Sequence, residues 1–472
     1  MVRNLSSGND LTAKRRAESA FGPRFMAPMY MGAALNPINS SLIATAMVAI
    51  AASMDVEVGK TSILVSSLYL TCAIAQPVAG RLAEEFGPRR VFLSGILIVL
   101  AGGVVGGLAP SLAALTVARI LIGAGTSAAY PSAMLLIRRR ATKVGLTSAP
   151  GGVLGGMAVT SAATLAIGPT VGGLLVGWLD WRATFLVNVP VALIAFVMAK
   201  LWIERDPAGA TWDRSVLGLL GRIDLPGIAA FGASISSLLV FLLALPNVNW
   251  VALGVSVLGA VVLVAHELRA DSPFIDFRLL ASNGLLTRTY VRYSLTLVGI
   301  YVVIYGFTQW MVAARGLSPT HAGLALLPMG VLSAVIARLV SRARHLHLLL
   351  VASAVCLILG AVAATMLDSH SPLPAIVLVT SLFGIVAGCG NVTNQTALYL
   401  AAPAERLGTA AGLLRTFGYV GSITAACLTG FAFRSGVDDS GLHLVGMALV
   451  AVGVVVLAMT VFDRPLAALA ER

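Results

Sequence analysis

The chain has 472 residues, of which 58% are hydrophobic and 11% charged, and its formal net charge is +12. Soluble domains carry about 25% charged residues, so this composition excludes an ordinary soluble domain and predicts many membrane helices. The basic residues lie between the apolar runs and not in one patch, which argues against a nucleic-acid-binding protein.

The N-terminus is expected to be a short cytoplasmic tail, residues 1–24, because this stretch is polar and holds Lys14, Arg15 and Arg16. The apolar run that follows, 25–52, is much longer than the core of a signal peptide, which has about 7–15 residues. We therefore predict that it is a true membrane span.

Apolar runs recur along the whole chain. A bilayer core requires about 20 mostly apolar residues per helix. The sequence predicts an all-α membrane protein with fourteen transmembrane helices at 25–52, 61–79, 91–108, 112–137, 153–177, 184–199, 225–245, 251–265, 293–313, 322–337, 348–366, 376–400, 410–431 and 442–462.

The distribution of Lys and Arg supports this count. With the N-terminus on the cytoplasmic side, 26 of the 32 basic residues lie in inner loops or tails. The outer loops hold only Lys60, Arg182, Arg315 and Arg434, and Arg119 and Arg415 lie within spans. Cytoplasmic loops carry such an excess. Both termini, including a C-terminal tail at 463–472, are therefore predicted to be cytoplasmic.

The loop lengths divide the chain into two six-helix halves, 25–203 and 293–462. Between them lie a linker and a two-helix hairpin, 204–292, which holds the two longest polar connections. Secondary transporters are commonly built from paired repeats with the substrate site between them.

One short connection, "GRLAEEFGPRR" from Gly80 to Arg90, concentrates charge between the second and third spans. Gly87 can adopt backbone angles forbidden to other residues, and Pro88 can begin the next helix. Its carboxylates and arginines could pair in one conformation and separate in another. We predict a conformational latch made of Gly80, Glu84, Gly87, Arg89 and Arg90.

Polar side chains within spans are costly and mark candidate functional positions. Arg119 is expected to face a wet cavity, the alternative being an arginine that extends to the outer surface. For Arg415, which lies at a similar depth from the inner side, the alternative is an arginine that extends to the inner surface. For the uncharged residues the alternative is hydrogen bonding between helices. The candidate cavity or coupling residues are Asn36, Asn39, Gln76, Arg119, Tyr130, Tyr305, Gln309, Asn394 and Arg415.

The sequence lacks buried carboxylates in its predicted spans, metal-ligand spacing of its cysteines, and catalytic motifs. No predicted span interior contains Asp or Glu, so a proton or a cationic substrate has no obvious buried partner. The four cysteines lie in spans without metal-ligand spacing, and no catalytic motif is recognisable. We expect no metal, no cofactor and no enzymatic activity.

The latch segment resembles the signature of the major facilitator superfamily between spans 2 and 3. The match covers Gly80, Leu82, Ala83, Gly87, Arg89 and Arg90, while Glu84 and Pro88 depart from it. In span 4, "ARILIGAGTSAAYP" is similar to the family's arginine motif at Arg119, Gly123, Gly125 and Pro131, with Ile122 in place of the usual Gln.

Three further segments resemble the fourteen-span drug:proton antiporter branch. These are "WRATFLVNVP" from Trp181, "GLSPTHAGLALLPMG" from Gly316, and an antiporter motif at Gly168, Pro169, Gly172 and Gly173. The antiporter motif is interpreted as a conformational hinge, with ordinary close packing as the alternative. The resemblance covers the chain from span 1 to span 14.

This resemblance implies an exporter of small amphipathic or hydrophobic molecules that works by alternating access and proton antiport. In such antiporters the arginine at the position of Arg119 takes part in proton coupling, and many carry Asp near the position of Asn36. The expected partners are a small-molecule substrate, protons and the lipid of the cytoplasmic membrane, with the protein a monomer. The alternatives are a uniporter or exporter of neutral or anionic compounds, and a membrane sensor with a transporter fold.

Overall fold

The computed structural model describes residues 21–146, 151–206, 224–244, 248–270, 273, 275, 277–340, 345–401 and 407–463. All regular secondary structure in these residues is helical. The first bundle contains α2 (Pro23–Leu42), η1 (Ile43–Thr45), α3 (Met47–Met54), η2 (Val58–Thr61), α4 (Ser62–Phe86), α5 (Pro88–Gly107), α6 (Leu112–Lys143), α7 (Gly151–Trp178), α8 (Ala183–Leu186) and α9 (Asn188–Trp202).

A helical hairpin and a second bundle follow. The hairpin is α11 (Leu225–Ala244) and α12 (Trp250–Glu267), followed by the short α13 (Phe277–Ser282). The second bundle contains α14 (Gly284–Val302), the π-helical segment η3 (Val303–Phe307), α15 (Thr308–Ala313), α16 (Pro319–Val340), α17 (Leu346–Ala364), α18 (Leu373–Ala401), α19 (Leu407–Ala432) and α20 (Asp439–Val461).

Ten helices in the described part of the chain are long and apolar enough to cross a membrane. The number is eleven when α2, η1 and α3, which bend by 60°, count as one span. The predicted fourteen are therefore not confirmed. Over α7 and α11 only the shorter stretches Ala163–Trp178 and Leu225–Phe241 have this apolar character.

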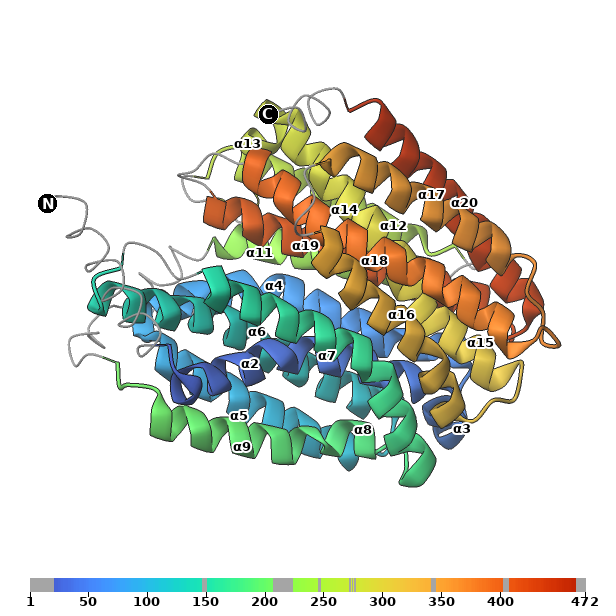
Figure 1. Cartoon of the computed structure of the whole chain (residues 1–472), viewed down its shortest axis with the longest axis horizontal. Coiled ribbons are helices and arrows are strands. Elements are labelled where there is room, and N and C mark those ends of the chain that lie inside the picture. Colours follow the sequence, from blue (N-terminus) through green and yellow to red (C-terminus); the bar gives the residue numbers. More distant parts are fainter. Residues whose placement is uncertain are drawn as a thin grey trace, which may run out of the picture.

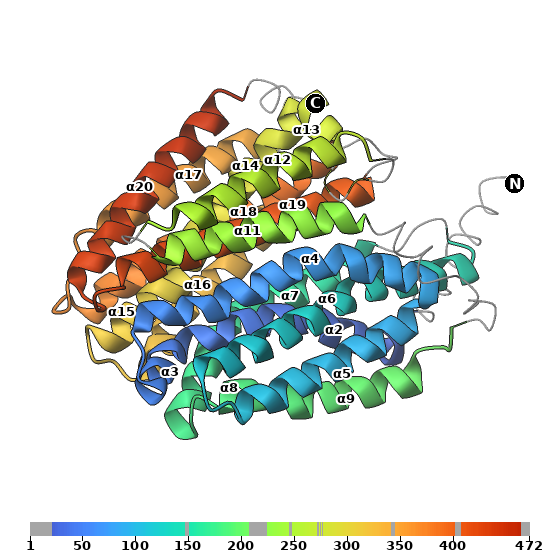
Figure 2. The same cartoon turned by 180° about the vertical axis from the view of Figure 1, so that it is seen from behind.

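The two bundles lie side by side, with the early helices in blue to green and the late helices in yellow to red (Figure 1). They meet mainly through two helix pairs, α4 with α19 and α7 with α16, with smaller contacts of η1, η2 and α3 against the second bundle. The reverse view shows α11 and α12 on the outside of the molecule (Figure 2), where α11 contacts both α4 and α19. The hairpin thus touches both bundles.

The molecule has two distinct ends. The helices α3, α8 and α15 lie at one of them, which we call the α15 end (Figure 1). At the opposite end, which we call the tail end, α2 begins and α20 finishes. The connection from α4 to α5 also lies at the tail end, because α4 runs away from the α15 end.

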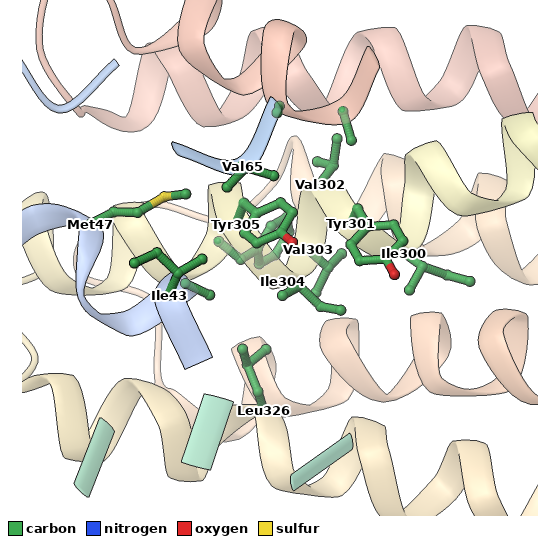
Figure 3. Packing of buried hydrophobic residues seen from close by; sticks show 14 of the residues in the cluster. Ile43, Met47, Val65, Ile300, Tyr301, Val302, Val303, Ile304, Tyr305 and Leu326 are labelled. Atoms are coloured by element: carbon green, nitrogen blue, oxygen red, sulfur yellow. The ribbon is translucent and has the colours of Figure 1, made fainter. Parts of the chain in front are cut away.

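The largest apolar core belongs to both bundles. It joins Ile43, Met47 and Val65 of the first bundle to Tyr305 and Leu326 of the second (Figure 3). The π-helical segment η3 passes through this core, and its five residues are all buried. Short π-helical segments within α-helices frequently occur at functional sites.

One helix begins earlier than predicted. The expected span 293–313 starts in the structure at Gly284, so Arg288 and Arg292 belong to α14 and not to a loop. The side chain of Asn283 caps this helix by accepting a hydrogen bond from the backbone N–H of Leu286 at 3.0 Å. A hydropathy-based boundary stops at the two arginines, whereas the backbone remains helical beyond them.

Candidate functional site

The α15 end is closed by a reciprocal contact between α7 and α16. Thr170 Oγ1 donates a hydrogen bond to the carbonyl oxygen of Gly323 at 3.0 Å. Thr320 Oγ1 donates to the carbonyl oxygen of Gly173 at 2.9 Å. The two segments, "PTVGG" at 169–173 and "PTHAG" at 319–323, share the pattern Pro-Thr-x-x-Gly. We call this contact the PTxxG pair.

The glycines of the PTxxG pair allow the two helix backbones to touch. A Cβ atom at Gly173 would overlap the carbonyl oxygen of Pro319, and one at Gly323 would overlap the carbonyl oxygen of Pro169. Two other glycines of the predicted antiporter motif, Gly168 and Gly172, face α2 at comparably short range. The motif therefore lies in close packing, and a hinge role remains a prediction.

Farther from the α15 end, tyrosines join the bundles. The hydroxyl groups of Tyr69 and Tyr305 lie 3.1 Å apart, and Tyr305 also donates to the carbonyl oxygen of Ser40 at 2.8 Å. The rings of Tyr301 and Tyr305 are stacked with centroids 5.7 Å apart. Gln309 donates to the sulfur of Met47 at 2.7 Å. Tyr305 and Gln309, both predicted from sequence, are thus buried where the bundles meet.

Arg119 is buried within the first bundle and is only 2% exposed. Its Nε donates to the carbonyl oxygen of Leu64 and its Nη1 to that of Asn39, both at 2.9 Å. Nη2 has no hydrogen-bond partner among the described residues. The side chain does not extend to the surface in this conformation, which removes the alternative of an arginine at the outer surface. A wet cavity at Arg119 stays a prediction.

The two asparagines of α2 have different partners. Asn36 Nδ2 donates to Cys72 Sγ at 3.0 Å and to Thr126 Oγ1 at 3.1 Å. Asn39 exchanges two hydrogen bonds with Asn188 of α9, at 2.6 and 2.8 Å. Asn39 therefore makes the helix–helix contact that was the alternative to a cavity role, while Asn36 remains half-buried between three helices.

Gln76, Tyr130 and Arg415 come together between the bundles. The Arg415 guanidinium carbon lies 3.8 Å from the centroid of the Tyr130 ring, so α19 contacts α6. Tyr419 donates a hydrogen bond to Gln76 Oε1 at 2.5 Å. All four side chains are half-buried. The sequence predicted three of them as cavity residues but did not single out Tyr419.

Asn394 belongs to a buried ionic network inside the second bundle. Arg292 donates from Nε to Asn394 Oδ1 at 2.9 Å and from Nη1 to Asp463 Oδ2 at 3.3 Å. Arg288 pairs with the same carboxylate at 2.9 Å. The side chains of Arg292 and Asp463 are fully buried. Sequence reasoning assigned Asp463 to a cytoplasmic tail and overlooked this network.

The latch segment has the expected backbone, since Gly87 has a φ of 98° and Pro88 begins α5. The partner of the turn is a residue that sequence reasoning missed. Asp206 accepts hydrogen bonds from the backbone N–H groups of Arg89 and Arg90, at 3.4 and 3.0 Å. The side chains of the predicted latch residue Glu84 and its neighbours Arg81 and Glu85 lie outside what the structure describes.

Asp206 also binds α6. Arg139 Nη1 lies 2.8 Å from Asp206 Oδ1, and the carboxylate is 1% exposed. Next to it, Glu204 pairs with Arg140 and Lys143. The hydrogen bond from Lys143, followed by the charges of the two cations, lowers the pKa of Glu204. These contacts join α6, α9 and the latch segment within the first bundle, as Asp463 joins helices of the second.

The described carboxylates all lie in loops or within three residues of a helix end. One of them is nevertheless buried, since Glu267, the last residue of α12, a helix able to cross a membrane, is 1% exposed. It lies beside Gly227, which is also close to Asp224. Within the described residues, the middle of the molecule therefore contains arginines without carboxylates.

Two helical bundles that meet along α4–α19 and α7–α16, with polar side chains between them, define the class of membrane transporters. The model of the Major Facilitator Superfamily matches residues 29–426, and the chain belongs to that superfamily. It is thus a transporter and not an enzyme. The chain is 31% identical over 443 residues to the uncharacterized MFS-type transporter YwoD of Bacillus subtilis, covering 93% of this chain and 96% of the relative.

Other relatives have names that refer to resistance. The methylenomycin A resistance protein of Streptomyces coelicolor is 26% identical over 443 residues, covering 89% of this chain and 87% of the relative. The puromycin resistance protein pur8 of Streptomyces alboniger is 30% identical over 370 residues, with coverages of 74% and 70%. These names describe the relatives.

Solved structures share the fold at low sequence identity. A structure titled for substrate recognition in proton dependent oligopeptide transporters has a TM-score of 0.67 and 13% identity, covering 96% of this chain and all of its own. The partially occluded inward open xylose transporter XylE of E. coli has a TM-score of 0.60 and 14% identity, covering 94% and 99%. This similarity establishes the fold alone.

Proposed function

We propose that the chain is an exporter of small amphipathic or hydrophobic molecules, works by alternating access and is coupled to proton antiport. It would act as a monomer in the cytoplasmic membrane, with fourteen spans and both termini in the cytoplasm. The resistance relatives favour export, and the antiporter motif favours the drug:proton antiporter branch. The three spans beyond the eleven candidates would be α7, α11 and α19.

The observation that carries this proposal is the division of contacts between the two ends. The PTxxG pair and the tyrosines join the bundles from the α15 end to the middle. The ionic networks of Asp206 and Asp463, at the tail end, each lie within one bundle. Rocking of one bundle against the other would exchange such contacts while each bundle keeps its own. The excess of Lys and Arg that the positive-inside rule describes favours a cytoplasmic tail end.

A second candidate function is export of neutral or anionic compounds without proton coupling. The observation that favours it is the middle of the molecule, where Arg119 and Arg415 have no carboxylate nearby among the described residues. A cationic drug would find no buried counter-charge there, and a proton would have no carboxylate carrier.

Uptake into inverted membrane vesicles tests both candidates. We expect vesicles containing the protein to accumulate a fluorescent neutral amphipathic compound above the level of empty-vector vesicles. Under proton antiport, an imposed gradient, acidic inside, raises accumulation, and a protonophore abolishes the increase. Accumulation that ignores the gradient supports the uncoupled exporter. No accumulation in either condition, with the protein inserted and folded, contradicts export.

A further inference from the structure

Five side chains from four helices meet between the bundles, and we call them the Arg415 cluster. They are Gln76 of α4, Tyr130 of α6, Tyr293 of α14, and Arg415 and Tyr419 of α19. Tyr293 lies against the backbone of Gly418, next to the two α19 residues. All five are half-buried, which sets them apart from the fully buried Tyr69 and Tyr305.

The guanidinium of Arg415 lies with one face against the Tyr130 ring, and the Tyr419 side chain is a further neighbour. Its carbon sits 3.8 Å from the Tyr130 ring centroid, a distance typical of stacking on an aromatic face. Stacking holds the plane of the group while its N–H donors point along the edges. A planar arginine edge matches a carboxylate, with which it can form two parallel hydrogen bonds.

In the part of the chain that the structure describes, no carboxylate pairs with Arg415. Among the described residues, the ion pairs of Asp and Glu are all at helix ends or in loops, and none includes Arg415. Arg119 adds a second positive charge nearer the α15 end. A positive charge within a membrane-spanning helix is costly when no negative charge offsets it, so an anion arriving between the bundles would be stabilised.

The position of the cluster also matches that of a ligand site. Along α4, Gln76 lies two turns nearer the tail end than Tyr69, and along α14, Tyr293 lies two turns nearer it than Tyr301. Toward the α15 end the path is filled by Tyr301, Tyr305 and their apolar neighbours (Figure 3). A molecule entering from the tail end would therefore meet the Arg415 cluster before the closed part of the interface.

We propose that the Arg415 cluster binds planar aromatic carboxylates, with the carboxylate on the edge of Arg415 and the ring among Tyr130, Tyr293 and Tyr419. Gln76 and Tyr419, already hydrogen-bonded to each other, would orient a second polar group of the ligand. This inference rests on the proposed export function, because it assigns a substrate class to the same path between the bundles.

Binding of three probes with the same ring tests the proposal: 2-naphthoate, 2-naphthamide and 2-naphthylmethylammonium. With the purified full-length protein, calorimetry should show naphthoate binding about tenfold more tightly than the amide, since a hydrogen bond to an ionised acceptor is roughly twice as strong as a neutral one. The ammonium probe should bind most weakly. Arg415→Gln should remove the preference for naphthoate while leaving the affinity for the amide within about threefold.

Matched variants separate a binding role from a folding role. Arg415→Lys keeps the charge and should retain part of the preference. Tyr130→Phe keeps the ring and should bind like the wild type, whereas Tyr130→Leu should weaken naphthoate. Arg182 provides the control, because its guanidinium also covers an aromatic ring, Trp181, with the carbon 4.2 Å from the centroid, but in an exposed loop. Arg182→Gln should leave binding of all three probes unchanged.

The outcomes distinguish this inference from the proposed function. Equal affinity for the three probes, or a preference for naphthoate that survives in Arg415→Gln, would overturn the assignment. If vesicles accumulate naphthamide but binding shows no preference for naphthoate, the inference fails and export stands. If the preference depends on Arg415 but vesicles accumulate no probe, the site stands and export fails.

Discussion

The contacts at the two ends of the molecule differ in their chemistry and in the helices that they join. At the α15 end, the PTxxG pair joins the bundles through hydroxyl groups, carbonyl oxygens and glycines, without charge. At the tail end, Asp206 and Asp463 form ion pairs, each within one bundle. Neutral contacts can separate without leaving a buried charge unpaired, whereas breaking a buried ion pair is costly. The neutral contacts between the bundles therefore suit an interface that opens, and the ion pairs suit bundles that stay rigid.

The largest effect is expected from filling the PTxxG pair. In Gly173→Val the side chain would overlap Pro319 and prevent α7 and α16 from approaching. Overpacking costs about 1–3 kcal/mol, which would lower the ratio of closed to open molecules at the α15 end by roughly 5- to 150-fold. Vesicle transport at matched expression should fall accordingly. Gly254→Ala is the control, because nothing lies within 4 Å of an added Cβ there. Wild-type transport by Gly173→Val would contradict the importance of this contact.

The next effect concerns the stability of the second bundle. Asp463→Asn would leave the fully buried Arg292 without its negative partner, and removing one member of a buried pair costs about 3–5 kcal/mol. Denaturant titration in detergent should detect this loss. The matched control is Asp180→Asn, which removes an exposed partner of Arg182 and should change stability by at most about 1 kcal/mol. Equal effects of the two variants would show that the Asp463 network does not hold the bundle.

The smallest effect is a dependence of stability on pH at the tail end. The hydrogen bond from Lys143 lowers the pKa of Glu204 in the folded protein, so its contribution is present above the pKa of the unfolded chain. It is lost as pH falls through the lower, folded pKa. Because Glu204 is 49% exposed, the contribution should be under about 1 kcal/mol.

Thermal unfolding of Glu204→Gln and wild type, followed from neutral to acidic pH, measures this contribution. The variant should unfold at a slightly lower temperature than wild type near neutrality, and the two should converge in acid. A difference that grows as pH falls would have the wrong sign. The hydrogen bonds of the PTxxG pair join hydroxyl groups to carbonyl oxygens, which do not titrate in this pH range, so Gly173→Val should show no such convergence.

Hydropathy and motif spacing predicted the helical class, the order of the helices and the conformation of Gly87, because these depend on local sequence. Contacts between residues far apart in the sequence could not be predicted from local patterns. The two Pro-Thr-x-x-Gly segments are 150 residues apart, and nothing in either indicates that they contact each other. Asp206 and Asp463 looked like loop residues, since burial of a charge at a helix end depends on arginines from other helices.

For the candidate site residues, too, the sequence indicated which positions are polar but not which helix each side chain faces. The sequence identified Tyr130 and Arg415 as polar positions within spans, and the structure places them in contact. It could not separate them from Asn39 or Asn394, which form hydrogen bonds within one bundle. All four are polar residues in apolar surroundings, and only the orientation of each helix decides which space a side chain faces.

The shared apolar core has a thermodynamic consequence for the empty transporter. Since Val65 and Tyr305 belong to one cluster but to different bundles, opening the α15 end would expose apolar surface at a cost of about 2.5 kcal/mol per 100 Å². The shared apolar core therefore favours the conformation closed at this end. Under the proposed alternating access, a bound substrate must interact more favourably with the opposite conformation to overcome that bias, so affinity measured on the empty protein will understate the strength of the contacts made at turnover.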